Sequence, residues 1–396
     1  MDGRDSTVHA GLDPIARARS VAPLLAKGAD RIEAARELPP DLLAALHEAR
    51  LFRLLLPKSL GGDECDFVTL AKVTEIIAAA DASTAWCLGQ GGGCAMSAAY
   101  LEPAVARRLF GRPDAVLAWG AGAVGSATRV AGGFRVSGQW SFASGSRHAT
   151  LLGAHCRVFD ADGRPELRPD GRQVEHTALF PRAKATIHDV WQVVGLRGTG
   201  SDTYDVEDLV VPVAETVDRE GLSEVHEPGT LYRFAQMLAY SSAFGGVMLG
   251  IARGTLDDLR TLAMTKTARG AASSMRDSQV FQFDLARLEA RLGAARAYHH
   301  QAYGAVWAAV DAGSEVTLDH RIAVRLASTH AINEGVDIVA QAYRAAGQSA
   351  IFETNPFERR LRDANSASQQ VQGRPSHYTT VGRHFLGLPP DTMMFI

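Results

Sequence analysis

The texture of the chain changes twice along its length, and this change constrains the fold more than any single motif. Up to about residue 112, and again from about residue 230, apolar residues recur at helical spacing. Between 113 and 218, Val, Thr, Trp and Phe alternate with Gly, and Asp-Gly turns fall at 162–163 and 170–171. We therefore expect an α+β chain with an N-terminal helical domain (1–112), a middle β domain (113–218) and a C-terminal helical bundle (219–396).

Local signals predict several elements within this frame. The run Phe67–Ala80 has a helical pattern, Asp81 can cap the segment after it, and Pro103 fits the first turn of a helix over 103–110. Asn355 is expected to cap a helix that has Pro356 at its first position. Three strands are predicted within the segments 134–137, 151–158 and 176–180.

Composition excludes several classes of protein. The 396 residues carry 41 basic and 44 acidic side chains, a net charge of -3, which is not the basic field that nucleic-acid or membrane-surface binding needs. The N-terminal stretch is acidic and polar, so no signal peptide is expected. The cysteines show neither CxxC spacing nor a nearby histidine cluster, so we expect reduced, buried thiols in a cytoplasmic protein without a metal site. They are Cys65, Cys87, Cys94 and Cys156.

Two long uncharged stretches require a check as membrane spans. Phe234–Ala252 contains Gln236, two serines and three glycines, and Ala82–Leu101 contains a Gly-Gly-Gly run. A span needs about 20 predominantly apolar residues. Both stretches are better interpreted as central helices of a large bundle.

Glycine-rich and histidine motifs are weak signals on their own. Gly120-Ala-Gly-Ala-Val-Gly125 matches GxGxxG, but β-like residues follow it, whereas a dinucleotide fingerprint opens a helix. Its glycines more simply allow a turn or a close approach to something flat or anionic. His299 and His300 are adjacent on a predicted helix and face different directions, which argues against a metal site. His148 and His155 lie in the β region, where a functional role is weighed against a structural one.

Four stretches together resemble the acyl-CoA dehydrogenase superfamily over nearly the whole chain. They are Leu54–Gly62, Gly138–Gly145 (GQWSFASG), Gly195–Ser201 (GLRGTGS) with Val211-Pro212, and Asn355–Asp363. The resemblance implies a helical domain, a β domain and a four-helix bundle, in a homotetramer. It also implies a flavin between the β domain and the bundle.

Two chemistries occur in families of this kind, and the resemblance separates them at one residue. Dehydrogenases need a carboxylate base, which in the commonest subfamily lies eight residues after the Asp of the Arg-Asp pair. Here that residue is Val371, and the alternative position on the first bundle helix, Ala239–Phe244, has no acid. The Trp140-Ser-Phe142-Ala-Ser144-Gly pattern is more similar to the oxygenase components of two-component flavin monooxygenases. These take reduced flavin from a separate reductase and react with O2 through a flavin C4a-hydroperoxide.

The resemblance also implies the catalytic residues. Ser144 would donate a hydrogen bond near flavin N5 or to the substrate, and a hydroxyl can also accept one. Many relatives have a histidine seven residues after the Asp, where this chain has Gln370, so phenol activation is in doubt and indoles, thiophenes or amines become more plausible substrates. His377 is a possible substitute for that histidine, and His148 is a further catalytic candidate.

Cofactor contacts follow from the resemblance position by position. The loop that lines the flavin corresponds to Trp119, Gly120, Gly125 and Ser126, and the strand at the flavin edge carries Trp140, Phe142 and Ser144. Arg269 corresponds to a phosphate-binding arginine, and Gly347 to a glycine that contacts the cofactor of a neighbouring subunit. The bound group would be reduced FMN or FAD.

Three classes of function therefore remain open. The first is a flavin-dependent monooxygenase oxygenase component acting on an aromatic, heteroaromatic or amine small molecule, with O2 and a flavin reductase as partners. The second is an acyl-CoA dehydrogenase-like flavoenzyme that holds FAD. The third is a binding or scaffold protein on the same fold, with neither nucleic acid nor membrane as a partner.

Overall fold

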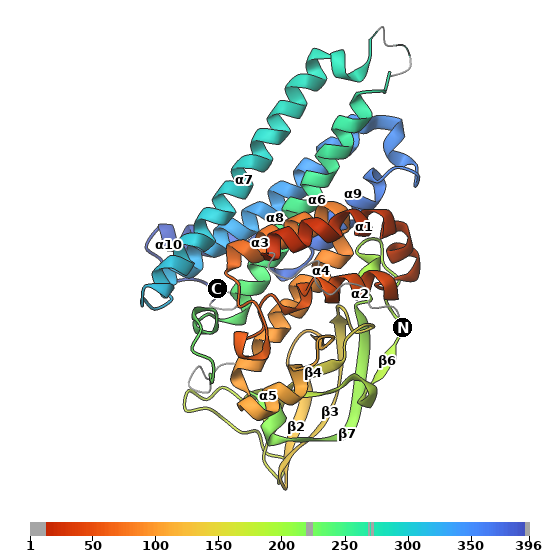
Figure 1. Ribbon diagram of the computed structural model, residues 1–396. Helices are drawn as coiled ribbons and strands as arrows, with labels where there is room; N and C mark the ends of the chain where they lie inside the picture. The colour runs from red at the N-terminus through yellow and green to blue at the C-terminus, as the bar shows by residue number, and fades with distance from the viewer. Residues whose placement is uncertain (1–12, 219–224, 268–269, 271–272, 393–396) are drawn as a thin grey trace.

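Three layers of structure follow one another along the chain in the computed structural model, which describes residues 13–218, 225–267, 270 and 273–392 (Figure 1). The first layer is helical, and its helices are α1 (Pro14–Ala35), α2 (Pro40–Glu48), α3 (Phe67–Ala80), α4 (Ala82–Ala95) and α5 (Pro103–Phe110). The predicted helices over 67–80 and 103–110 are confirmed to the residue. Asp81 caps α4 by accepting from the Thr84 amide at 2.7 Å, as expected.

The middle layer is one twisted sheet, and the helices of the first layer lie beside it (Figure 1). Its order is β6-β7-β3-β2-β4-β5-β8, and β1 pairs with β4 in addition. The three predicted strand segments fall within β3, β4 and β5. The strands are β1 (Leu117–Trp119), β2 (Gly125–Val130), β3 (Gly133–Ala143), β4 (Leu151–Phe159), β5 (Glu175–Pro181), β6 (Thr186–His188), β7 (Asp202–Pro212) and β8 (Thr216–Val217).

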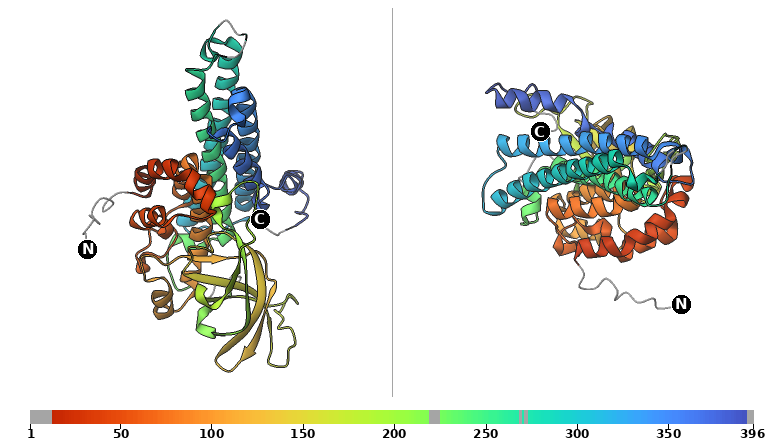
Figure 2. Two further views of the ribbon diagram at one scale, coloured as in Figure 1. Left: turned by 90° about the vertical axis from the view of Figure 1, so that its right-hand side faces the viewer. Right: turned by 90° about the horizontal axis from the view of Figure 1, so that it is seen from above.

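The C-terminal layer is a bundle of long helices, as the helical period predicts, and the α+β fold class is confirmed. The hairpin of α6 and α7 extends away from the sheet and beyond the rest of the molecule (Figures 1 and 2). The proposed cap at Asn355 is wrong by one residue, because Pro356 is itself the N-cap and α9 begins at Phe357. The helices are α6 (Gln236–Ala263), α7 (Gln279–Asp311), α8 (Leu318–Ala346), α9 (Phe357–Ser368) and α10 (Ser376–Phe385).

Glycines let the two uncharged segments pack into the protein core. A Cβ on Gly93 of α4 would lie 2.3 Å from the Tyr240 ring of α6, and one on Gly250 would lie 2.3 Å from the Glu75 carbonyl of α3. These close approaches explain why two stretches without charges are central helices, as expected. Within the part of the chain that the structure describes, no helix has both the length and the apolarity to cross a bilayer.

Candidate functional site

Three segments that are distant in the sequence meet where β3 ends. The Ala121 amide after β1 donates to the Ser141 carbonyl, and the Gly145 amide donates to the Thr199 carbonyl at 2.9 Å. The loop 195–201 is held in turn by α9, since the Leu196 amide donates to the Asp363 carboxylate at 2.6 Å. The structure therefore brings together the loop at 119–125, the strand end at 142–145 and the loop 195–201.

Phe142 adopts a backbone conformation that a bulky residue rarely takes. Its φ is +62°, in the left-handed region, and its side chain is 65% exposed with Trp191 edge-on against the ring at 6.1 Å. Val124 and Val194, on the two neighbouring segments, are also exposed. An aromatic ring held on the surface by a strained backbone is a feature typical of a contact that a ligand completes.

Ser144 lies next to this surface, but its hydroxyl is almost buried. It accepts from the indole Nε1 of Trp86 at 3.1 Å and lies 2.7 Å from the Ser201 hydroxyl. Trp86 is on α4 and Ser201 is the last residue of the loop 195–201, so Ser144 joins the β domain to the N-terminal helices.

Trp140 and the glycines of the 120–125 loop have packing roles. Trp140 is 0% exposed, stacks on Tyr204 at 5.4 Å and donates to the His155 carbonyl, so direct contact between Trp140 and a cofactor is contradicted by its burial. A Cβ on Gly125 would lie 2.2 Å from the Trp140 ring, and one on Gly120 would lie 2.6 Å from the Trp140 Cβ. The flat group that these glycines approach is thus an internal indole, and β2 rather than a helix begins at Gly125.

Two further residues that are expected to contact the cofactor lie around the same loop. Trp119 is 4% exposed and packs edge-on against His155, so at most its rim can touch a ligand. Ser126 is half-buried, and its hydroxyl donates to the Ser137 carbonyl at 3.3 Å across the β2–β3 pair. Both residues remain proposed flavin contacts.

His148 is not a suitable base. Its ring packs against Phe52 at 5.3 Å, and its Nε2 is buried without a hydrogen-bond partner. Burial, together with the positive charges of His47 and Arg182, lowers the pKa of His148 to about 3. A neutral imidazole with so low a pKa does not take a proton from a substrate at neutral pH.

Gln370 lies at the start of a short 3-10 turn, Val371–Gly373, that follows α9. Its amide oxygen accepts from the Gln372 amide at 2.6 Å, so this oxygen caps the turn. His377 is buried, and its Nε2 donates to the Val371 carbonyl at 2.7 Å while burial lowers the pKa of its imidazole. His377 therefore stabilises the turn through the Val371 carbonyl. This bond gives no support to the idea that His377 replaces the missing histidine.

Helix α8 holds this turn through one line of side chains. Arg325 donates to the side-chain oxygen of Gln372, Thr329 donates to the Gln372 carbonyl at 3.1 Å, and Asn333 donates to the Gly373 carbonyl at 3.0 Å. These three residues are four apart, so they share one face of the helix. The position of Gln370 is thus set by α8, which sequence spacing alone does not reveal.

An aromatic stack that the sequence patterns do not predict lies beside Ser144. Trp86 of α4 stacks on Phe244 of α6 with centroids 4.1 Å apart, and Phe244 lies parallel to Tyr240 at 6.0 Å. The Tyr240 hydroxyl lies 3.5 Å from the Cys94 sulfur, which gives the stack a polar end. The i, i+4 spacing of Tyr240 and Phe244 was the available signal, but its partner on α4 is more than 140 residues away.

The predicted cofactor contact Gly347 is the C-cap residue of α8. Gly347, at the end of α8, has φ +57° and is exposed, and Lys266 reaches the neighbouring Ala346 carbonyl at 2.5 Å. Arg269 lies outside the described residues. Lys266 is a cation beside Gly347 that was not singled out from the sequence.

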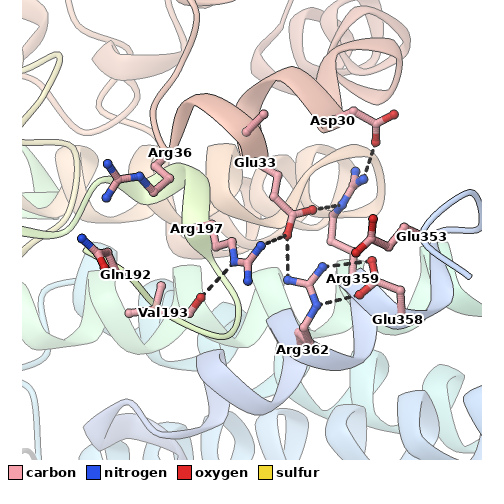
Figure 3. A pocket seen from close by; sticks show the side chains of 11 residues that line it. Asp30, Glu33, Arg36, Gln192, Val193, Arg197, Glu353, Glu358, Arg359 and Arg362 are labelled. Carbon is pink, nitrogen blue, oxygen red and sulfur yellow. Dashed lines mark hydrogen bonds and ion pairs between the residues drawn. The ribbon is translucent and has the colours of Figure 1, made fainter. Parts of the chain in front are cut away.

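A pocket of about 660 Å³ lies behind the loop 195–201, between α1 and α9 (Figure 3). At its centre Glu33 contacts Arg197, Arg359 and Arg362, as the dashed lines show. Burial opposes ionisation of Glu33, but the arginines outweigh it and hold the pKa of its carboxyl below the ordinary value. These ion pairs connect α1, α9 and the loop 195–201. Among the described residues no cluster of histidine, cysteine and carboxylate side chains fits a metal ion.

The residues at the end of β3 fit a flavin. The exposed ring of Phe142 with Trp191 offers an apolar surface for a flat heterocycle, and Ser144 adds a hydroxyl at its edge. The side chains that bond the Ser144 hydroxyl, Trp86 and Ser201, are uncharged, which suits the binding of a neutral heterocycle at this edge. When bound, a reduced flavin supplies the two electrons that activate O2.

Comparison with known proteins identifies the family to which the chain belongs. Residues 17–108 match the family model of the acyl-CoA dehydrogenase N-terminal domain, and residues 242–372 match that of the C-terminal domain. The chain is 31% identical to an indole-3-acetate monooxygenase of Pseudomonas putida over 355 residues, 90% of this chain and 89% of the relative. It is 28% identical to the flavin-dependent monooxygenase oxygenase subunit HsaA of Rhodococcus jostii over 389 residues, 96% and 100% of the two chains. The structure of XiaF from Streptomyces sp., in complex with FADH2 and glycerol, matches with a TM-score of 0.88, 26% identity and 96% of each chain covered.

The chain belongs to the acyl-CoA dehydrogenase superfamily, in the branch of flavin-dependent monooxygenases. It is a flavin-dependent oxidoreductase, an oxygenase component that works with reduced flavin. The second and third classes of function left open by the sequence are set aside by this membership.

Proposed function

We propose that this oxygenase component acts on an electron-rich heteroaromatic compound of the indole type. Gln370 occupies the position where the resemblance implies a histidine base, and its amide oxygen is already used to cap the turn at Val371–Gly373. A phenol must lose its proton before it becomes strongly nucleophilic, whereas an indole ring is nucleophilic without deprotonation. This single observation, a site with an amide in place of the base, carries the choice of substrate class.

The aromatic stack supports the same choice. Trp86, Phe244 and Tyr240 form a stack where α4 meets α6, and the Trp86 indole also bonds Ser144. A bicyclic aromatic substrate would gain from offset stacking against the outer edge of this stack. The Tyr240 hydroxyl would set the orientation of its polar edge. The relative from Pseudomonas putida is named for an indole substrate, which is consistent with this proposal.

Each proposed residue has a defined task in the overall reaction. The two-electron reduced flavin, O2 and the substrate give oxidised flavin, a product with one added oxygen atom, and one water. Phe142 and the rim of Trp119 would line the heterocycle of the cofactor, and Ser144 would bond its edge. The free side of the Gln370 amide would orient the substrate, and the helical layers on both sides would exclude water.

A homotetramer is part of the proposal. Several large apolar residues of the C-terminal layer are exposed, which is typical of surfaces that neighbouring subunits cover. They are Val280, Phe283, Phe385 and Leu386, with Ile351 and Phe352 beside Gly347. A neighbouring subunit's flavin phosphates would then meet Gly347, Lys266 and Arg269. The four free, buried cysteines are consistent with a cytoplasmic location.

A substrate panel with one designed variant tests the substrate class. With a flavin reductase and NADH, the wild-type protein should oxygenate indole and indole-3-acetate with little H2O2, while phenol and resorcinol should only stimulate H2O2 release. Its pH profile should show no group near 6.5, the ordinary pKa of histidine. Gln370→His should add activity on the phenols, because it restores a base at that position. Gln369→His, at an exposed neighbouring position, is the control and should add none. If the wild-type protein oxygenated phenols with little release of H2O2, the proposal would be contradicted.

A further inference from the structure

A chain of hydroxyl groups runs from Ser144 into the protein. The Ser144 and Ser201 oxygens are 2.7 Å apart, those of Ser201 and Thr199 are 2.7 Å apart, and Thr199 lies 2.9 Å from the Leu196 carbonyl. All three hydroxyl side chains are less than 10% exposed, so water does not compete for them along the chain. The Trp86 indole joins at the Ser144 end.

Hydrogen counting fixes the direction of this chain. Each hydroxyl has one hydrogen to donate and can accept at two positions. The Leu196 carbonyl can only accept, so Thr199 donates to it, and the Thr199 oxygen must accept from Ser201. Ser201 has then used its hydrogen and must accept from Ser144.

Ser144 is left as an acceptor. Its hydrogen points inward to Ser201, and one of its two acceptor positions is taken by the Trp86 N–H, which can only donate. One acceptor position remains for a ligand. In this arrangement Ser144 would accept a hydrogen bond from the flavin, whereas the resemblance implies that it donates one.

The Leu196 carbonyl, at the inner end of the chain of hydroxyl groups, is held in place by other contacts. The Leu196 carbonyl also accepts from the Trp191 indole at 3.0 Å, and the Leu196 amide is bound by Asp363. Leu196 itself has φ +53°, a conformation that these contacts hold in place. In the absence of a ligand, reversing the chain would give up the bond from Thr199 to this carbonyl, and the Ser144 hydrogen would find no acceptor among the partners of Ser144 in its place.

We propose that Thr199 and Ser201 are positioning residues that give the site its preference for reduced flavin. Reduced flavin carries a hydrogen on N5 and can donate it to an acceptor, whereas N5 of oxidised flavin is itself an acceptor. A Ser144 oxygen that is held as an acceptor bonds the first and not the second. The inference rests on the proposed placement of Ser144 at the flavin, and it assigns the redox selectivity to two residues behind it.

The experiment measures the dissociation constants of oxidised and reduced FMN and FAD for the purified protein, the latter under anaerobic conditions. In Ser201→Ala the Ser144 hydrogen loses its acceptor and can turn outward. The ratio of oxidised to reduced dissociation constants should then fall roughly three- to tenfold, the equivalent of one hydrogen bond. A tenfold fall lowers the two-electron midpoint potential of the bound flavin by about 30 mV, which gives a second readout. Thr199→Val should act in the same direction, and Thr199→Ser should keep the wild-type ratio.

Matched variants separate the possible outcomes. Ser146→Ala removes a buried hydroxyl that bonds the Gly200 carbonyl of the same loop but lies outside the chain, so its ratio should be that of the wild type. Suppose that Ser144→Ala changes the ratio of dissociation constants, whereas Ser201→Ala and Thr199→Val change neither this ratio nor the midpoint potential of the bound flavin. The positioning role of Thr199 and Ser201 would then be wrong. If Ser144→Ala changes neither dissociation constant, Ser144 is not at the flavin and the proposed site fails first. Thermal unfolding identifies any variant that does not fold, and Ser201→Ala and Thr199→Ser then decide the result.

Discussion

Gln372→Leu should lower the free energy of unfolding by about 3–5 kcal/mol. The side-chain oxygen of Gln372 accepts from Arg325, and both residues are buried. Within the described parts of the chain Arg325 forms no ion pair with a carboxylate, so this amide is its main compensation. Burial lowers the pKa of Arg325 to about 10, yet the guanidinium stays charged at neutral pH. Leucine keeps the volume and removes the acceptor, which leaves a buried charge without a partner.

Urea denaturation at fixed protein concentration measures this change. Gln372→Glu should retain wild-type stability near pH 7, because it gives the guanidinium a carboxylate partner. The double variant Arg325→Met/Gln372→Leu should be more stable than Gln372→Leu alone, since the buried charge is gone. Gln369→Leu, on the exposed side of the same segment, should stay within about 0.5 kcal/mol of the wild type. A Gln372→Leu protein as stable as this control would show that Arg325 is balanced in another way.

Asp363→Asn should stabilise the protein above pH 7 and leave it nearly unchanged at about pH 4. Burial raises the pKa of Asp363 from 3.8 to about 7, with Asp81 and Glu33 adding to the rise and the Leu196 amide and Arg362 opposing it. Between these two pKa values the unfolded chain has lost a proton that the folded protein still binds, so stability falls as the pH rises. The total loss is up to about 4 kcal/mol. Asparagine keeps an oxygen for the Leu196 amide and never ionises, so the loss should disappear.

The measurement is the free energy of unfolding at pH 4, 5, 6, 7 and 8 for both proteins. The two curves should separate progressively from about pH 4 to about pH 7, with the Asn variant more stable by about 2–4 kcal/mol at pH 8. Asp284→Asn, at a partly exposed position on α7, serves as the control and should follow the wild-type curve. An Asn variant that is less stable than the wild type at pH 8 would mean that the ionised carboxylate is needed to hold the loop 195–201.

The fold could be predicted from the sequence because its signals are local. Helical periodicity over Phe67–Ala80 and alternating residues around β3 and β4 depend on neighbours a few positions away. Asp81 predicts the start of α4 in the same way, because a capping residue acts on amides only two or three positions away. The cap at Asn355 was misplaced because Pro356 can serve either as the cap or as the first helical residue.

The site was predicted less completely because its contacts join distant positions. Ser144 was singled out by its motif, but its partners Trp86 and Ser201 lie 58 and 57 positions away and neither has a pattern of its own. Trp140 was assigned to the cofactor from the same motif, although it fills the core of the sheet. Arg325 and Gln372 look like ordinary surface residues in the sequence, and only the packing of α8 on the 3-10 turn shows that they are buried together.

We expect the chain to oxygenate its substrate with O2 and reduced flavin. The most direct test is a single turnover in which the protein, loaded anaerobically with reduced flavin and indole, is mixed with buffer containing ¹⁸O2. The product should contain one ¹⁸O atom per molecule, with product formed in close to one-to-one ratio to flavin oxidised. Oxidation of the flavin with release of all the oxygen as H2O2 for every heteroaromatic, aromatic and amine substrate tried, together with bleaching of oxidised flavin by an acyl-CoA, would contradict it.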